Sequence, residues 1–260
     1  MFLLDESMYH KVLKPLGEVT LNKLFARSVV EKHVSGKIYV DNTENPSTFY
    51  VLHPYGMALL FGNNENTGFN QGFVAYAGNI HKERNRQEWL QAFPPVNWDS
   101  IIRSLLGNIE INTRVNFKFN ALKYPVRKDT IMPPYQIQRT GKELFEKMNG
   151  SVIPRYFWES ADHFFNMGVG FSAIYNSEPV STAYSAFIHD RQLELGIETV
   201  ESHRGKGLAF YTCCALIDYC LQNDYEPVWA CKLENNASCN LAKKLGFEPV
   251  ITIPYYLLPV

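Results

Sequence analysis

The sequence has no cysteine before residue 213, no excess of charge of either sign and no long apolar run. With 25 basic and 26 acidic residues, it offers no basic platform for nucleic acid or for a lipid surface, and we expect neither as a partner. No stretch approaches the roughly 18 consecutive apolar residues of a membrane-spanning helix. What remains is a globular chain of 260 residues, 46% of them hydrophobic, which is enough for a substantial core.

The cysteines are five, an odd number, and show neither a disulfide framework nor the spacing of metal ligands. The first ten residues, MFLLDESMYH, lack the basic segment and the long apolar stretch of a secretory signal. We therefore expect a reducing, cytoplasmic location, no bound metal, and cysteines that pack in the core.

A proline-rich, charged segment, KYPVRKDTIMPPY at residues 123–135, divides the chain. Its three prolines suit neither a long helix nor a central strand, so we place a domain boundary there. Residues 1–125 are expected to form a smaller N-terminal α/β domain of unassigned type. Residues 126–260 are expected to form a second domain.

The N-terminal half carries few local signals. Residues 49–61 predict two strands around a turn at residues 54–56. Alternation over residues 72–80 predicts a further strand, and Asp99 is a candidate N-cap for a helix. None of these features matches a motif that we can assign.

The C-terminal half has a clearer order of elements. Three β-rich runs at residues 168–176, 179–189 and 191–200 are separated by hairpin-length turns and predict an antiparallel meander. A helix over 207–223 and a short strand over 227–233 then imply a parallel crossover. A helix over 236–245 and a last strand or hairpin over 247–256 complete a mixed α+β fold with a mostly antiparallel sheet.

The residues RGKGLA at 204–209 form a glycine-punctuated turn that opens the helix over 207–223. Amides at a helix N-terminus, with no side chains at Gly205 and Gly207, make a site for a pyrophosphate. The spacing matches neither a Walker A loop nor a GxGxxG fingerprint. Considered alone, the loop is equally consistent with a turn that binds nothing.

The surroundings of this loop resemble those in GCN5-related N-acetyltransferases (GNAT). The loop matches the family's R-x-x-G-x-G/A signature, and the later residues match its N-x-x-S/A and L-G-F pattern. The matching residues are Arg204, Gly207, Ala209, Asn235, Ser238, Leu245, Gly246 and Phe247. The combined pattern spans about residues 168–250 and looks most like the branch that includes zwittermicin A resistance acetyltransferases.

The resemblance implies an enzyme that moves an acetyl group from acetyl-CoA to a primary amine of a small molecule, by direct transfer in a ternary complex. Polyamine, amino-sugar or antibiotic-like acceptors are candidates, and an acyl donor longer than acetyl stays open. The implied sheet is split between its fourth and fifth strands. The protein is expected to be a monomer or a homodimer.

The resemblance also assigns the cofactor site. The pantetheine arm would pair with the end of the third β-rich run, around Glu198, and the diphosphate would bind the loop amides. The assigned residues are Thr199, Val200, Arg204, Gly205, Lys206, Gly207, Leu208, Ala209 and Asn235. For Asn235, capping of a helix is an equal alternative.

Glu194 and Glu198 are the candidate catalytic bases, because strand alternation puts them on one face with Gly196. Glu194 corresponds best to the family's fourth-strand base, and the alternative is a solvated strand face. Ala242 stands where the family has its tyrosine general acid. Ser238, Tyr211 or water is a candidate replacement, and this departure leaves a catalytically weak or inactive CoA-binding sensor as the alternative function.

Overall fold

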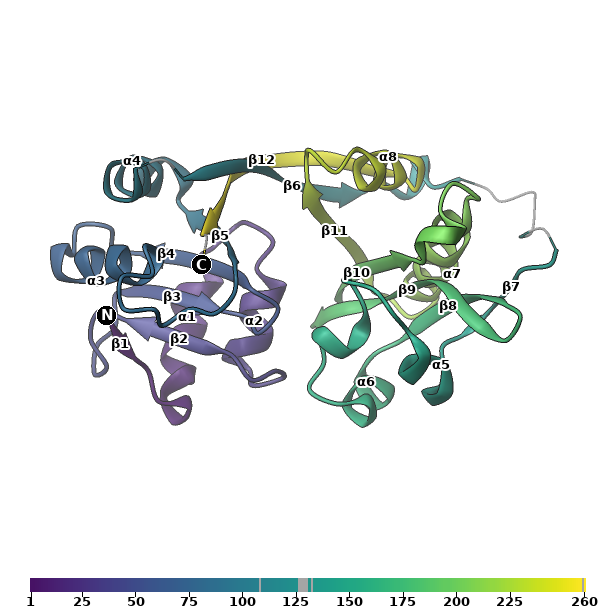
Figure 1. Ribbon diagram of the computed structural model, residues 1–260, viewed down its shortest axis with the longest axis horizontal. Coiled ribbons are helices and arrows are strands. Elements are labelled where there is room, and N and C mark those ends of the chain that lie inside the picture. Colours follow the sequence, from purple (N-terminus) through teal and green to yellow (C-terminus); the bar gives the residue numbers. More distant parts are fainter. Residues whose placement is uncertain (108, 126–130, 132, 259) are drawn as a thin grey trace. The chain divides into compact units, whose positions relative to one another are not determined.

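The computed structural model describes residues 1–107, 109–125, 131, 133–258 and 260 (Figure 1). Residues 126–130 and 132, at the expected domain boundary, lie outside the described residues. The chain forms two compact units. Unit 1 comprises Met1–Asn116, Lys232–Glu234 and Ile251–Val260, and unit 2 comprises Phe117–Cys231 and Asn235–Val250. Three strands contribute residues to both units: β6 (Glu110–Phe119), β12 (Phe247–Leu258) and β11 (Glu226–Lys232), whose last residue, Lys232, belongs to unit 1.

Unit 1 contains a sheet with flanking helices. Its first five strands are neighbours in chain order: β1 (Phe2–Leu3), β2 (Lys37–Val40), β3 (Thr48–Leu52), β4 (Met57–Gly62) and β5 (Glu88–Phe93). Its helices are η1 (Glu6–Val12), α1 (Leu13–Gly17), α2 (Leu24–Val30), α3 (Thr67–Ala77) and α4 (Pro95–Leu106). The strands from β1 to β4 are antiparallel, whereas β4 and β5 are parallel. The predicted strand pair at residues 49–61 is confirmed as β3 and β4.

Two predictions for this unit are wrong, and helix capping explains the first. Residues 72–80 were expected to form a strand, but most of them belong to α3 and the turn after it. The Asn66 side chain accepts from the amide of Phe69 and so starts the helix earlier. Phe69, Phe73 and Tyr76 then fall at helical spacing on the buried face.

The second error concerns α4. This helix begins at Pro95, so Asp99 lies within it and is not its N-cap. The Asp99 carboxylate instead pairs with Arg103 at 2.9 Å, one turn later, and accepts from the Tyr256 hydroxyl. Proline at the first helical position needs no amide partner, which suits the earlier start.

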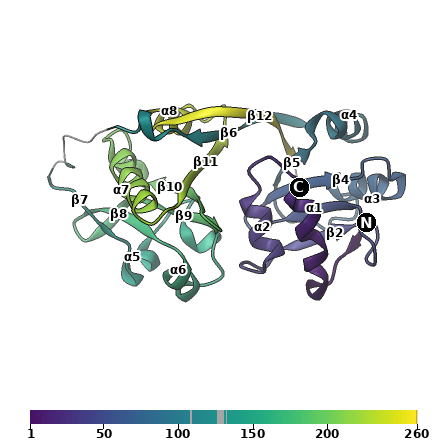
Figure 2. The same ribbon diagram turned by 180° about the vertical axis from the view of Figure 1, so that it is seen from behind.

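Unit 2 contains five further strands, which are again neighbours in chain order: β7 (Gln136–Arg139), β8 (Gly170–Tyr175), β9 (Glu178–His189), β10 (Gln192–Thr199) and β11 (Glu226–Lys232). Its helices are η2 (Ala121–Lys123), α5 (Lys142–Lys147), η3 (Pro154–Tyr156), α6 (Ala161–Met167), η4 (Glu201–His203), α7 (Leu208–Gln222) and α8 (Asn236–Lys244). The long helix α7 packs across β8, β9 and β10 (Figure 2). The predicted meander, crossover and last helix are all confirmed.

The two units repeat one order of elements. In each, three antiparallel strands are followed by a helix and by a strand parallel to the third of them. The β7–β8 pair of unit 2 is antiparallel, like the β1–β2 pair of unit 1. The expected α+β class with a mostly antiparallel sheet is confirmed.

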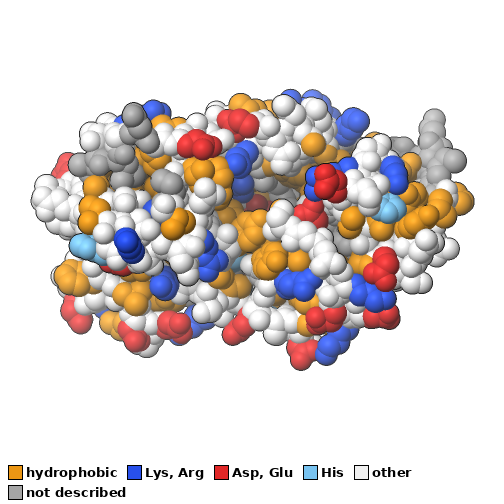
Figure 3. All heavy atoms as spheres, viewed as in Figure 1, with side chains coloured by type: hydrophobic (Ala, Val, Ile, Leu, Met, Phe, Trp, Pro, Cys, Tyr) orange, Lys and Arg blue, Asp and Glu red, His pale blue; other side chains and the backbone are white. Residues whose placement is uncertain are grey.

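Charges of the two signs nearly balance in this chain. Figure 3 shows acidic and basic side chains mixed over the face in view, consistent with a formal net charge of −1. In the described part of the chain, no helix has the length and apolar character needed to cross a bilayer. The same residues contain no group of three or more His, Cys, Asp or Glu that could hold a metal ion.

Candidate functional site

β10 and β11 separate soon after they begin to pair. Gln192, Leu193 and Glu194 lie opposite Glu226, Pro227 and Val228, and the register among the described residues ends there. β10 nevertheless continues to Thr199 and β11 to Lys232. The edge of β10 is therefore open after Glu194, which confirms the split expected between the fourth and fifth strands.

The backbone groups of β10 alternate between its neighbour β9 and the open edge. The Val200 amide donates to the Val180 carbonyl at 2.9 Å, on the β9 side. By alternation, the amides and carbonyls of Ile197 and Thr199 point away from β9, toward the open edge. The Val200 carbonyl also accepts from the His203 amide, so both backbone groups of Val200 are engaged. An extended ligand arm can pair with both backbone groups of Ile197 and with the amide of Thr199, whose carbonyl accepts from Nε of Arg204 at 3.1 Å.

The loop that follows β10 presents bare backbone. Gly205 and Gly207 both have φ of +77°, in the left-handed region that favours glycine. A Cβ at Gly205 would meet no atom within 4 Å, and one at Gly207 would meet only Tyr211, at 3.9 Å. Within the described chain, no amide from Gly205 to Ala209 donates to another protein group. These free amides at the start of α7 fit a diphosphate.

The cationic side chains of this loop are directed to other protein groups. Nη2 of Arg204 lies 3.4 Å from Oε1 of Glu198. Nζ of Lys206 donates to the Ser202 carbonyl at 3.1 Å and lies 6.0 Å from the Tyr135 ring centre. The backbone of the loop, rather than its charge, is what the structure leaves available to a ligand.

Glu194, Gly196 and Glu198 share one face of β10, as strand alternation predicted. Tyr184 lies opposite Gly196 on β9, and its ring occupies the space that a Cβ at Gly196 would need. Glu194 is only 4% exposed and sits where β10 and β11 separate, so it is not part of a solvated face. The sequence analysis missed Tyr184. The available signal was a glycine inside a strand, which often marks a close approach.

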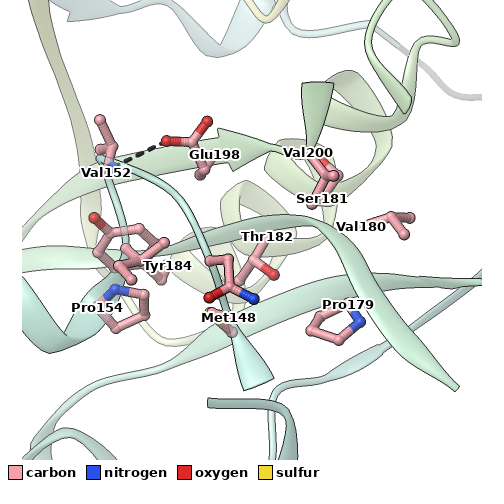
Figure 4. A pocket seen from close by; sticks show the side chains of 12 residues that line it. Met148, Val152, Pro154, Pro179, Val180, Ser181, Thr182, Tyr184, Glu198 and Val200 are labelled. Atoms are coloured by element: carbon pink, nitrogen blue, oxygen red, sulfur yellow. Dashed lines mark hydrogen bonds between the residues drawn. The ribbon is translucent and has the colours of Figure 1, made fainter. Parts of the chain in front are cut away.

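A groove lies on this same face of unit 2 (Figure 4). The groove is shallow and open to solvent, and the space that the centre of a water molecule can reach within it is only about 10 Å³. The lining residues are Met148, Asn149, Val152, Ile153, Pro154, Pro179, Val180, Ser181, Thr182, Tyr184, Glu198 and Val200. The lining is largely apolar, and its single carboxylate, Glu198, is also a predicted site residue.

Asn235 and Ser238 lie at the start of α8, and Tyr211 lies on α7. The Asn235 side chain accepts from the Ser238 amide at 3.1 Å and caps this helix. The Ser238 hydroxyl accepts from Nε1 of Trp229 at 3.2 Å. Ala242 is fully buried and offers no hydroxyl.

The cysteines are buried, as their number and spacing in the sequence suggested. None of the five forms a disulfide in the described part of the chain. Cys239 lies with its sulfur 3.5 Å from that of Cys231, inside the core of unit 2. Its burial suits packing rather than attack on a thioester.

The sequence model of the GNAT acetyltransferase family matches residues 15–256. The chain belongs to the GNAT acetyltransferase family. It is therefore an acyltransferase of a family that uses acetyl-CoA. The chain is 26% identical over 235 residues to the uncharacterized N-acetyltransferase YdfB of Bacillus subtilis (strain 168), with 89% of each chain covered.

Solved structures share the fold. A GCN5-related N-acetyltransferase-like protein from Streptococcus suis 89/1591 superimposes with a TM-score of 0.72 at 20% identity, covering 96% of this chain and 98% of that one. A tandem GNAT protein from the clavulanic acid biosynthesis pathway superimposes with a TM-score of 0.63 at 12% identity, covering 98% and 96%. At these identities the likeness concerns the fold alone.

Proposed function

We propose that this GNAT protein transfers an acetyl group from acetyl-CoA to a primary amine of a small molecule, by direct transfer in a ternary complex. The observation that carries the proposal is the open edge of β10 leading directly into the bare loop at residues 204–209. The arm of the donor pairs with Ile197 and Thr199 in place of a strand. The diphosphate binds the loop amides, and the macrodipole of α7 adds to their attraction.

Glu194 is the general base in this proposal. A neutral amine attacks the thioester carbonyl, the C–N bond forms, the C–S bond breaks, and one proton leaves the nitrogen. Glu194 is buried at the point where the strands separate, next to the open edge on which the donor arm lies. It accepts that proton directly or through one water. A backbone amide at the open edge stabilises the oxyanion.

The thiolate leaves without a dedicated tyrosine on α8. Ala242 cannot donate a proton, and we keep Ser238 and Tyr211 as candidate donors beside water. A thiolate is a stable leaving group, with an ordinary thiol pKa near about 8.5, so turnover does not require an acid. We also propose a cytoplasmic location, a polyamine, amino-sugar or antibiotic-like acceptor, and a monomeric or homodimeric state.

We also propose that residues 126–260 form the catalytic domain. Its site residues on β10 and in the following loop all belong to unit 2. Residues 1–125, which supply most of unit 1, would then hold no part of the acetyl-CoA site.

The proposal is tested by calorimetry with acetyl-CoA, followed by thiol release with a panel of polyamines, aminoglycosides and amino sugars. We expect binding, and release with at least one amine. Glu194→Gln should lower kcat by about 10²–10⁴ with little change in KM. Glu226→Gln, an exposed change at the start of β11, is the control.

Two results would contradict the proposal in different ways. Absence of binding at about millimolar acetyl-CoA would remove it entirely. Tight binding with no thiol release from any amine would favour the CoA-binding sensor, the alternative that the missing tyrosine at Ala242 supports.

A further inference from the structure

We propose that Glu198 is a positioning residue that fastens one wall of the groove, the segment at residues 148–154, to the diphosphate loop. This inference rests on the proposed function of the site. It takes the groove as the place of the acceptor amine and the loop as the place of the donor, and it assigns Glu198 a role other than that of a base.

One carboxylate oxygen of Glu198 holds the groove wall. Oε2 accepts from the Ser151 amide at 3.0 Å and from the Ser151 hydroxyl at 3.2 Å. It also accepts from the Val152 amide at 2.9 Å (Figure 4). Hydrogen bonds to an ionised group are about twice as strong as neutral ones. Val152 lines the groove, so these bonds set the position of its wall.

The other carboxylate oxygen faces the first residue of the diphosphate loop. Oε1 of Glu198 lies 3.4 Å from Nη2 of Arg204, and Nε of Arg204 donates to the Thr199 carbonyl at 3.1 Å. The Glu198 side chain is 13% exposed, but that of Arg204 is 62% exposed, so solvent screens the pair and its contribution is that of a partly exposed contact. A single carboxylate thus joins the two parts of the site.

Gly150 makes this approach possible. Its φ is +147°, and a Cβ there would come 2.5 Å from Cγ of Glu198. A side chain at this position would therefore displace the carboxylate. The absence of a side chain is an observation independent of the hydrogen bonds, and it points to the same contact.

These contacts leave Glu198 poorly suited to take a proton from the acceptor amine. Oε2 already receives three donors, and Oε1 faces a guanidinium. Glu194, which lies nearer the point where the strands separate, remains the base. Glu198 instead affects acceptor binding, because it sets the position of the groove wall. The donor loop affects the same wall, because Arg204 contacts the Glu198 carboxylate.

Hydrogen exchange of a peptide covering residues 148–154, measured by mass spectrometry, tests the contact without any acceptor. In Glu198→Ala we expect the Ser151 and Val152 amides to exchange about tenfold faster. Glu198→Gln keeps an acceptor oxygen and should stay within about threefold of the wild type. Glu201→Gln, an exposed neighbour, should match the wild type. Unchanged exchange in Glu198→Ala would overturn the proposal.

Acetyl-CoA itself probes the connection to the loop. Saturating acetyl-CoA should slow exchange of the 148–154 peptide in the wild type, because the ordered loop holds Arg204 against the carboxylate. Glu198→Gln places an amide group near Arg204 and should lose this slowing, although its affinity for acetyl-CoA stays within about threefold. Equal slowing in both proteins would show that Glu198 does not transmit it.

Kinetics separate positioning from catalysis. With the panel amine that gives the fastest thiol release, Glu198→Ala should raise the KM of the amine about tenfold and keep kcat within about threefold. Glu198→Gln should largely restore KM, and the acidic limb of the pH profile should persist in both. A fall in kcat of about 10²–10⁴ with loss of that limb would make Glu198 the base and overturn the proposal. If the wild type fails to bind acetyl-CoA, the proposed function falls, and the exchange experiment still decides the contact.

Gly150→Ala gives an independent check. The added methyl group would push Glu198 away, and the φ of +147° would also strain an alanine there, so KM should rise as in Glu198→Ala and exchange of the 148–154 peptide should rise at least as much. Gly141→Ala is the matched control, because a Cβ there meets no atom within 4 Å and the backbone has negative φ. A normal KM in Gly150→Ala, with the protein folded, would contradict the assignment.

Discussion

The two units share an order of elements but differ at the step that decides whether a cofactor can enter the sheet. In unit 1, β4 and β5 stay paired from Met57 opposite Trp89 to Phe61 opposite Phe93. In unit 2, the corresponding strands β10 and β11 separate after Glu194 and Val228. The same arrangement of strands is therefore closed in one unit and open in the other.

The loops after these strands differ in the same sense. In unit 1, the side chains of Asn63 and Asn66 accept from the amides of Glu65 and Phe69. Protein side chains thus occupy donors at the start of α3, whereas the corresponding donors of unit 2 are available. A closed strand pair and a self-capped loop together leave unit 1 no place for a diphosphate, so we expect one acetyl-CoA site per chain.

The largest effect should come from filling the open loop. Gly207→Trp places an indole where the diphosphate must meet backbone amides, and loss of two or more such bonds weakens binding by about a hundredfold or more. Calorimetry with acetyl-CoA should show one site per wild-type chain and none in the variant.

The matched control is Gly68→Trp, at the start of α3 in unit 1, where a Cβ would meet only Asn66 at 3.6 Å. We expect unchanged affinity. Two sites per chain, or retained affinity in Gly207→Trp, would show that the difference between the loops has been misread.

The next effect concerns stability, because unit 1 has a buried carboxylate at the start of β5. Glu88, at the start of β5, is 2% exposed and accepts from the hydroxyls of Tyr50 and Tyr76. Burial first, and the charge of Glu88 second, raise the pKa of both phenols, which therefore stay protonated. Glu88→Ala leaves two buried hydroxyl groups without their acceptor. It should lower the free energy of unfolding, measured with denaturant, by about 2–6 kcal/mol.

Glu226, the first residue of β11, is the counterpart in unit 2 and is exposed. Glu226→Ala should change the free energy of unfolding by no more than about 0.5 kcal/mol. Similar losses in both variants would mean that Glu88 does not distinguish the closed unit from the open one.

The sequence predicted the elements of unit 2 far better than those of unit 1. The reason is that the patterns in unit 2 are each contained within a few consecutive residues. Hairpin turns, the RGKGLA loop and the L-G-F ending are local patterns, and each produced a correct element. In unit 1, the deciding residue for α3 was the cap Asn66, which is one asparagine among several in the loop. The alternation at residues 72–80 was then misleading, because the apolar residues Phe73 and Tyr76 also fit the spacing of one helix face.

Within the site, the sequence predicted which side chains share a face but not what they contact. Alternation placed Glu194 and Glu198 together correctly. The burial of Glu194 and the amide contacts of Glu198 depend on segments far apart in the chain, such as Ser151 and Glu198, which are 47 residues apart. The length over which two parallel strands stay paired is likewise a long-range property. No pattern within one strand reveals it.

Unit 1 also contains a buried histidine, His53, that should make its stability sensitive to acid. Desolvation, and to a lesser extent the charge of Arg86, lower the pKa of the buried His53 in unit 1 to about 3. In the unfolded chain its pKa is near about 6.5, so below that pH the unfolded state takes up a proton that the folded state refuses. Stability should then fall by about 1.4 kcal/mol per pH unit as the pH decreases from about 6.5 toward 3.

His53→Asn should flatten this slope when unfolding by denaturant is followed from pH 7 to pH 4. Its side-chain oxygen can still accept from the Tyr55 amide, as the imidazole does at 3.0 Å. His81→Asn, at an exposed histidine of the same unit, should leave the slope unchanged. An identical slope in His53→Asn and the wild type would exclude His53 as its source.

The smallest effect should come from the charge of the open loop itself. Lys206 is held by the Ser202 carbonyl and the Tyr135 ring, and exposed ion pairs contribute only about 0–1 kcal/mol. Lys206→Met should therefore weaken acetyl-CoA binding by about fivefold or less, with Lys206→Arg as the control that keeps the charge. A loss of about tenfold or more in Lys206→Met alone would mean that charge distinguishes the two loops. A small loss would leave the bare amides of unit 2, set against the asparagine-capped amides of unit 1, as the physical basis of the difference.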